Sequence, residues 1–259
     1  MTNAPDSVRR LAQRFGELPQ VVAVALAGSH GAGAGDAESD FDLYVYTSRD
    51  VAVEFRRALM GEAPEIDNRF WETGDEWSDP ATGARLDIMY RRPECIEDQL
   101  ERVLVRHEAA IGFTTCFWYN VIHSAALFDP RGWYRQLQHC AAVPYPEELR
   151  RAVVAKNWPI LRRNRSSYRR QIGVALKRGD AVSVQHRVTA LLASYFDVWF
   201  AIDRKAHPGE KRLLTHLPEP CALLVRDVLN ARPEELLARI DALLYALDAR
   251  LEAAGLVGP

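Results

Sequence analysis

The segment that most constrains the fold joins an apolar run to a glycine-rich turn and a second strand pattern. Residues 21–27 read VVAVALA, a continuous and largely β-branched run that is typical of a buried strand. The stretch GSHGAGAGDAESDFDL follows from Gly28 to Leu43 and has too many glycines for a helix interior. Its end runs into the alternating pattern DFDLYVYT, residues 40–47, which predicts a second strand. Two strands joined by a turn therefore predict a sheet near the N-terminus.

The remaining patterns divide the chain into a mixed region and a helical region. Up to Tyr90, helices are expected at 7–18 and 51–60, further strands at 65–72 and 85–90, and a loop at TGDEWSDPATG, residues 73–83. Beyond Pro93, helices are expected at 94–107, 113–128, 131–139, 147–178, 181–204 and 233–254. The sequence thus predicts an α+β fold, with an N-terminal mixed β-sheet and flanking helices followed by a C-terminal α-helical bundle. We expect a catalytic domain at 1–135 and a helical bundle domain at 136–259.

Three aspartates indicate a metal site. Side chains at i and i+2 of a strand share a face, so Asp40 and Asp42 project together. Two adjacent carboxylates repel by about 1 kcal/mol in water and more where solvent is reduced, whereas Mg²⁺ takes one or two carboxylates together with phosphate oxygens and water. Asp87 lies between two apolar residues and needs a partner there. Placed beside DFDLYVYT, Asp87 would complete a cluster for two metal ions, an arrangement that suits in-line phosphoryl displacement.

The turn before the aspartates suits a phosphate. Gly28 allows an anion to approach the backbone closely, and Ser29 supplies a hydroxyl and a backbone N–H. A short helix that begins near His30 would direct its N-terminus at the same anion. His30 itself is expected to be an exposed turn residue, with contact to a phosphate as the alternative.

Together these residues resemble a known signature. Gly28-Ser29, a gap of ten residues and then Asp40-Phe41-Asp42-Leu43 resemble the motif of the polymerase-β-like nucleotidyltransferase superfamily, in its minimal, small-molecule branch. Asp87, between hydrophobic residues, matches the third carboxylate position of that family. The motif-bearing part covers about residues 20–90. The helical remainder resembles the C-terminal bundle of the kanamycin, streptomycin and lincosamide nucleotidyltransferases in architecture only.

The resemblance implies nucleotidyl transfer. An NTP, usually ATP, binds with Mg²⁺, an acceptor hydroxyl attacks the α-phosphorus, and pyrophosphate leaves. Asp40 and Asp42 would hold two Mg²⁺ ions, and Asp87 would be the third metal ligand or the general base. Gly28 and Ser29 would contact the β and γ phosphates. The expected partners are an NTP and a small molecule that carries the acceptor hydroxyl, with antibiotics among the candidates.

Other residues near the motif leave alternatives open. Asp87 is the simplest general base, but spacing does not separate it from Glu72, Glu76 or Glu108. Lys211, in HPGEKRLL, is expected to neutralise the triphosphate as a point charge, with an exposed lysine as the alternative.

The charge distribution is uneven. Residues 36–98 contain 17 Asp and Glu against 7 Lys and Arg, a balance of −10, whereas residues 150–178 contain 10 Lys and Arg and no Asp or Glu. Such halves suit a site that holds both metal cations and an anionic ligand, with two separately solvated faces of opposite charge as the alternative that charge alone favours. Arg162, Arg165 and Arg169 recur at helical spacing, and triphosphate, a nucleic-acid backbone and solvent are all open as their partners.

The expected setting is the cytoplasm, without a membrane partner. No apolar run reaches the ~20 residues that span a bilayer, and MTNAPDSVRR has no apolar signal core. We expect no nucleic-acid partner. Two alternatives to small-molecule modification remain: a nucleotidyltransferase that modifies a protein or tRNA, and an NTP-binding regulatory module with little catalysis.

Overall fold

The chain forms two compact units that are interleaved in sequence. The computed structural model describes residues 4–33, 35–36, 39–61, 64–69 and 72–256. The first unit, here called the sheet unit, contains Met1–Glu101 and Phe117–Val143; the second, the helical unit, contains Arg102–Cys116 and Pro144–Pro259. The catalytic domain expected at 1–135 and the bundle domain expected at 136–259 stay predictions, and the segment 102–116 groups with the helical unit.

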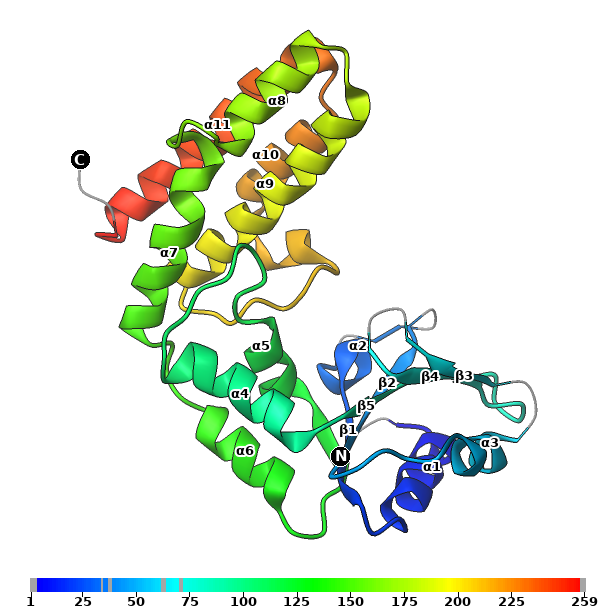
Figure 1. The fold of residues 1–259 in the computed structure, drawn as a ribbon. Coiled ribbons are helices and arrows are strands. Elements are labelled where there is room, and N and C mark those ends of the chain that lie inside the picture. The colour runs from blue at the N-terminus through cyan, green and yellow to red at the C-terminus, as the bar shows by residue number, and fades with distance from the viewer. Residues whose placement is uncertain (1–3, 34, 37–38, 62–63, 70–71, 257–259) are drawn as a thin grey trace. The chain divides into compact units, whose positions relative to one another are not determined.

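Helices and strands alternate through the first half of the chain, and helices fill the second half (Figure 1). The elements up to residue 141 are α1 (Asp6–Gly16), β1 (Val21–Leu26), α2 (Gly28–Gly31), β2 (Phe41–Thr47), α3 (Val53–Met60), β3 (Glu65–Asn68), β4 (Gly74–Ser78), β5 (Arg85–Arg91), α4 (Pro93–Leu104), α5 (Cys116–His123), β6 (Ala125–Phe128) and α6 (Trp133–Ala141). They are followed by α7 (Glu147–Arg162), α8 (Tyr168–Lys177), α9 (Ala181–Ile202), the 3₁₀ helix η1 (Leu213–His216), α10 (Glu219–Leu229) and α11 (Pro233–Ala253).

The strands form one mixed sheet in the order β3-β4-β5-β2-β1-β6. β2 and β5 pair in parallel, and every other neighbouring pair is antiparallel. The predicted α+β fold, with an N-terminal mixed sheet and C-terminal helices, is confirmed.

One face of the sheet is apolar and carries the core of the sheet unit. Leu43 and Val45 of β2 and Leu86 and Ile88 of β5 are buried there, together with residues of α1 and α3. Both helices cover this face (Figure 1). Because side chains alternate along a strand, Asp42 and Asp87 lie on the opposite face. The hydrophobic core thus fixes which face presents the aspartates.

The segment predicted as a loop at 73–83 contains a strand, β4, so that prediction is wrong. Asp75 in this strand is buried, where it accepts hydrogen bonds from Arg56 Nη1 at 2.5 Å and from the Tyr90 hydroxyl at 2.7 Å. The polar composition of residues 73–83 resembles that of a loop. The two residues that pair with Asp75, Arg56 and Tyr90, lie in other elements. Local sequence therefore does not reveal that the carboxylate is compensated.

Three further predictions differ from the structure. Residues 125–128, expected in a helix, form β6 and pair with β1. The helix predicted at 147–178 is broken into α7 and α8, with Pro159 inside α7. α10 has no predicted counterpart, because Pro218 and Pro220 indicate a break in the sequence; Pro220 lies in the first turn of α10, where proline is tolerated.

A buried polar cluster ties the segment 102–116 to the helical unit. Thr114 donates to Asp197 from its backbone N–H at 3.0 Å and from its hydroxyl at 2.5 Å. Asn157 of α7 donates to Asp197 at 3.2 Å and accepts from the Gly112 N–H at 3.0 Å. These bonds satisfy the Asp197 carboxylate, which would otherwise be costly to bury. They are the physical reason why this segment groups with the helical unit.

Long helices build the helical unit. α9 packs against α7 and α8, and α11 packs against α8 and α10 (Figure 1). Leu191, Tyr195, Phe196 and Trp199 are buried along α9 and form part of the core of the bundle. Within the described ranges, no helix combines the length and the apolar character that crossing a membrane requires.

Replacing Arg56 tests the buried ion pair. Arg56→Ala should lower the free energy of unfolding by about 3–5 kcal/mol, because it leaves Asp75 buried without its charge partner. The control is Arg57→Ala, an exposed arginine one position along α3, which should cost less than about 1 kcal/mol. Urea unfolding measures both, and equal losses would contradict the assigned role of the pair.

Burial raises the pKa of Asp197 to about 6. Since this lies above the unfolded value of 3.8, the folded protein binds more protons between about pH 4 and 6, and stability from this group falls as the pH rises through that window. The Asp197→Asn variant should lack this pH-dependent fall in the free energy of unfolding, which amounts to up to about 3 kcal/mol. Urea unfolding at pH 4.5, 5.5 and 7 measures it, with the exposed Asp50→Asn as control. Parallel pH profiles of wild type and Asp197→Asn would refute the assignment.

Candidate active site

Four acidic residues lie in register across four neighbouring strands. Asp42 of β2 pairs with Asp87 of β5 in the parallel ladder, Asp87 pairs with Glu76 of β4, and Glu76 pairs with Glu65 of β3. Register partners project from the same face of a sheet. We call Asp42, Asp87, Glu76 and Glu65 the carboxylate row. It crosses the face opposite the apolar core.

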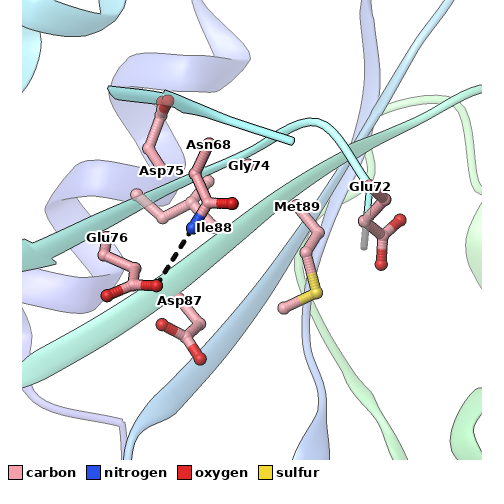
Figure 2. Close-up of a pocket in the computed structure, with 8 residues that line it drawn as sticks. All are labelled: Asn68, Glu72, Gly74, Asp75, Glu76, Asp87, Ile88 and Met89. Carbon is pink, nitrogen blue, oxygen red and sulfur yellow. Dashed lines mark hydrogen bonds between the residues drawn. The ribbon is translucent and has the colours of Figure 1, made fainter. Parts of the chain in front are cut away.

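The negative charges of the row act on Glu76. Desolvation raises the pKa of this side chain, and the charges of Asp87 and Glu65 raise it further. Asn68 Nδ2 donates a hydrogen bond to Glu76 Oε1 at 3.1 Å, which opposes the increase. Figure 2 shows this bond and the adjacent Asp87 side chain. Glu76 therefore takes up a proton more readily than an ordinary glutamate.

Gly28 is in close contact with Asp42. A Cβ atom on Gly28 would lie 1.7 Å from Asp42 Oδ2, and Gly28 has a φ of +58°, a conformation that favours glycine. The Ala27 N–H also donates to the Asp42 carbonyl at 2.8 Å. Only glycine fits here. The close approach predicted for a phosphate is thus made, in this structure, by the Asp42 carboxylate.

His30 connects the start of the turn to the residues next to β2. Its ring stacks on Phe41 with the ring centroids 3.9 Å apart, and its Nε2 lies 3.1 Å from the Ser39 carbonyl oxygen. His30 is half-buried rather than exposed, so the expected exposed turn residue is wrong. Ser29, also half-buried, is in the four-residue helix α2. Residues 34, 37 and 38 of the glycine-rich stretch lie outside the described residues, as do 70 and 71 of the predicted third strand.

Asp40 is held by an arginine. It comes directly before β2, and its Oδ1 lies 2.7 Å from Arg85 Nε. Among the residues that the structure describes, no group of three or more His, Cys, Asp or Glu side chains is arranged to hold a metal ion. The structure therefore brings Asp42 and Asp87 together in register, whereas Asp40 is ion-paired. A three-carboxylate metal site remains a prediction.

Two hollows share the Glu76–Asp87 pair. The smaller, of about 100 Å³, is also lined by Asn68 and Met89 (Figure 2). The larger, of about 790 Å³, is also lined by Trp77 and by the Asp40–Arg85 pair among others. The larger volume is within the range of small-molecule sites.

The other candidate residues are engaged by arginine or belong to the helical unit. Glu72 forms two hydrogen bonds with Arg91, whose guanidinium lies 3.8 Å from the centre of the Tyr44 ring. Glu108 belongs to the helical unit and pairs with Arg106 at 3.1 Å. Lys211 also belongs to the helical unit and is exposed. Its nucleotide-binding role, like those of Gly28 and Ser29, stays a prediction.

Glu65 and Arg85 are absent from the predicted site. Arg85 lies two residues before Asp87, and Asp40 lies two residues before Asp42. Parallel pairing of the two strands, with Asp42 beside Asp87, would therefore have placed Arg85 next to Asp40. Glu65 can be assigned to the site only once β4 is recognised as the strand between β3 and β5.

No family model matches the chain, and no curated protein matches it. Among solved structures, a nucleotidyltransferase-like protein from Exiguobacterium sibiricum 255-15 matches with 12% sequence identity and a TM-score of 0.47, over 96% of this chain and 76% of that chain. With a TM-score below 0.5, this likeness does not enter the argument for function.

Gly28→Ala tests the contact with Asp42. The new methyl group collides with the carboxylate, so the variant should lose about 1–3 kcal/mol more unfolding free energy than a glycine without such a neighbour. Gly33→Ala is the matched control, since Gly33 has a φ of +71° with nothing within 4 Å of the place that an added methyl group would occupy. Thermal and urea unfolding compare the two, and equal losses would show that the contact with Asp42 is not restrictive.

Proposed function

We propose that the protein is a Mg²⁺-dependent nucleotidyltransferase that moves a nucleoside monophosphate, AMP from ATP, onto a hydroxyl group of a small molecule and releases pyrophosphate. The observation that carries the proposal is the parallel register of Asp42 with Asp87, next to Gly28. These three residues belong to separate parts of the Gly-Ser, Asp-x-Asp and third-aspartate motif, and they meet at one place on the sheet.

The donor set fits magnesium. Asp42 and Asp87 supply two carboxylates on one face, and Mg²⁺ commonly takes one or two carboxylates plus phosphate oxygens and water. Asp40 is the third proposed metal ligand. Because Arg85 already holds Asp40, the guanidinium and a second metal ion compete for the same carboxylate. Bound Mg²⁺ would neutralise the charge that develops on the transferred phosphoryl group.

We assign removal of the proton from the acceptor hydroxyl to carboxylate side chains of this chain. A general base has to lie within hydrogen-bond reach of the acceptor hydroxyl. Asp87 and Glu76 both line the larger hollow, whereas Glu72 is tied to Arg91. The raised pKa of Glu76 brings it closer to the range useful for proton transfer. We assign the base to this pair.

The larger hollow is our candidate acceptor site. Its volume of about 790 Å³ suits a drug-sized molecule. The carboxylates of Glu65, Glu76 and Asp87 on its wall favour a positively charged acceptor, and the Trp77 side chain offers a surface for a ring. Amine-bearing, polyhydroxylated antibiotics have this chemistry.

Two other functions remain as alternatives: transfer of a nucleotide to a protein or tRNA, and NTP binding without appreciable turnover. Incubation with radiolabelled NTPs, MgCl₂ and a panel of aminoglycosides, lincosamides, proteins and tRNA distinguishes them. Label on a small molecule supports the main proposal. Label only on a macromolecule favours the first alternative, and Mg²⁺-dependent NTP binding without transfer favours the second.

Charge removal at the register pair tests the mechanism. Asp42→Asn and Asp87→Asn should each lower the rate of Mg²⁺-dependent pyrophosphate release by at least about 100-fold, because each removes a proposed metal ligand. The control is Asp50→Asn, whose side chain is 97% exposed, and it should keep the wild-type rate. Wild-type activity in both register variants, with unfolding unchanged, would overturn the metal assignment.

A further inference from the structure

A basic groove lies on the helical unit, between α8 and the beginning of α9. Its volume is about 440 Å³. Arg165 precedes α8, Arg170 lies in α8, Arg178 follows its end and Arg187 lies in α9, so the four arginines come from both sides of the helical hairpin. All four side chains are exposed. The groove is separate from the carboxylate row, which belongs to the sheet unit.

Most of this positive charge is uncompensated. Within the described part of the chain, no ion pair involves Arg165, Arg170 or Arg187, whereas Arg162 and Arg169 nearby are paired with Asp248 and Asp241. The arginines at the groove are therefore distinct from those that stabilise the bundle.

The acidic residue that lines the groove, Asp180, is already engaged. It caps α9 by accepting hydrogen bonds from the Ser183 N–H at 3.0 Å and the Ser183 hydroxyl at 2.6 Å. These bonds, and the nearby charge of Arg178, lower the pKa of Asp180. Asp180 thus offsets one arginine, and three positive charges remain available to a ligand.

The spacing favours a ligand with several phosphates. Arg170 and Arg178 are eight residues apart, which corresponds to about 12 Å along a helix axis. This span is longer than one phosphate group. Guanidinium groups bind phosphate oxygens in a planar, bidentate manner. Gln171 also lines the groove, where its Nε2 donates to the Ser166 carbonyl at 2.6 Å. No aromatic ring is among the described lining residues, so the groove offers no platform on which a base stacks.

We propose that this groove binds the phosphate backbone of a nucleic acid, independently of its base sequence. A chain of phosphates can contact several of these guanidiniums at once, and the lack of a stacking surface leaves the bases unread. The proposal replaces the expectation, made from the sequence, that nucleic acid is not a partner. It rests on the helical unit alone and does not depend on the proposed transferase activity.

Fluorescence anisotropy with the full chain tests the groove. The probes are labelled 15-nucleotide RNA and DNA strands of mixed sequence, titrated at 50 to 200 mM NaCl. With three phosphates neutralised, the logarithm of the association constant should fall with the logarithm of salt concentration with a slope of about −2. Two unrelated base sequences should bind with affinities within about threefold of each other.

Charge reversal locates the binding site. Arg170→Glu/Arg187→Glu should weaken binding at least about 10-fold at 50 mM NaCl and make the salt slope shallower by about 1.4. The matched control, Arg49→Glu/Arg131→Glu, makes the same charge change at exposed arginines of the sheet unit and should lose less than about threefold. If the reversed variant does not fold, Arg170→Gln/Arg187→Gln takes its place, with circular dichroism as the check.

Three results would overturn the proposal. The first is the absence of binding to either strand at 50 mM NaCl with protein up to 100 μM. The second is an equal loss of affinity in the groove and control variants. The third is tighter, groove-dependent binding of a multiply phosphorylated peptide or of phosphatidylserine vesicles than of either strand, which would assign the groove to a protein or a membrane surface instead.

Discussion

The parallel pairing of β2 with β5 is the constraint on which the candidate site depends. It sets Asp42 directly beside Asp87 and aligns Asp40 with Arg85 at the end of the same ladder. Two carboxylates so placed repel each other, and the repulsion grows as solvent is reduced. Gly28 contributes the space that the Asp42 carboxylate occupies. Burial of a core does not require this arrangement, whereas it suits the Mg²⁺ ion that we propose.

Carboxylate side chains have different surroundings on the two faces of the sheet. Asp75, on the apolar side, is buried and is compensated by Arg56 and by the Tyr90 hydroxyl. Glu76, the next residue, lies on the other face beside Asp87, where like charges raise its pKa. Strand alternation alone separates these two environments. One carboxylate therefore stabilises the fold, while its neighbour in sequence is available for chemistry.

The two units carry opposite charge, and this gives each its own ligand chemistry. The region 36–98, in the sheet unit, has a balance of −10, and the region 150–178, in the helical unit, has 10 basic residues and no acidic ones. A negative surface attracts metal ions and amine-bearing molecules, and a positive groove attracts phosphates. Asp241 and Asp248 of α11 neutralise part of the basic helices, whereas Arg165, Arg170 and Arg187 at the groove have no ion pair among the described residues.

The sequence by itself determined the fold class, the apolar strands and the motif that contains Gly28, Asp42 and Asp87, because strand periodicity and residue chemistry are local properties. Only the tertiary structure decided that β4 is a strand, that Glu76 lies beside Asp87, and that Arg85 holds Asp40. These facts depend on register between strands far apart in the chain. The sequence records which side chains are present, but pairing across the sheet selects which of them meet.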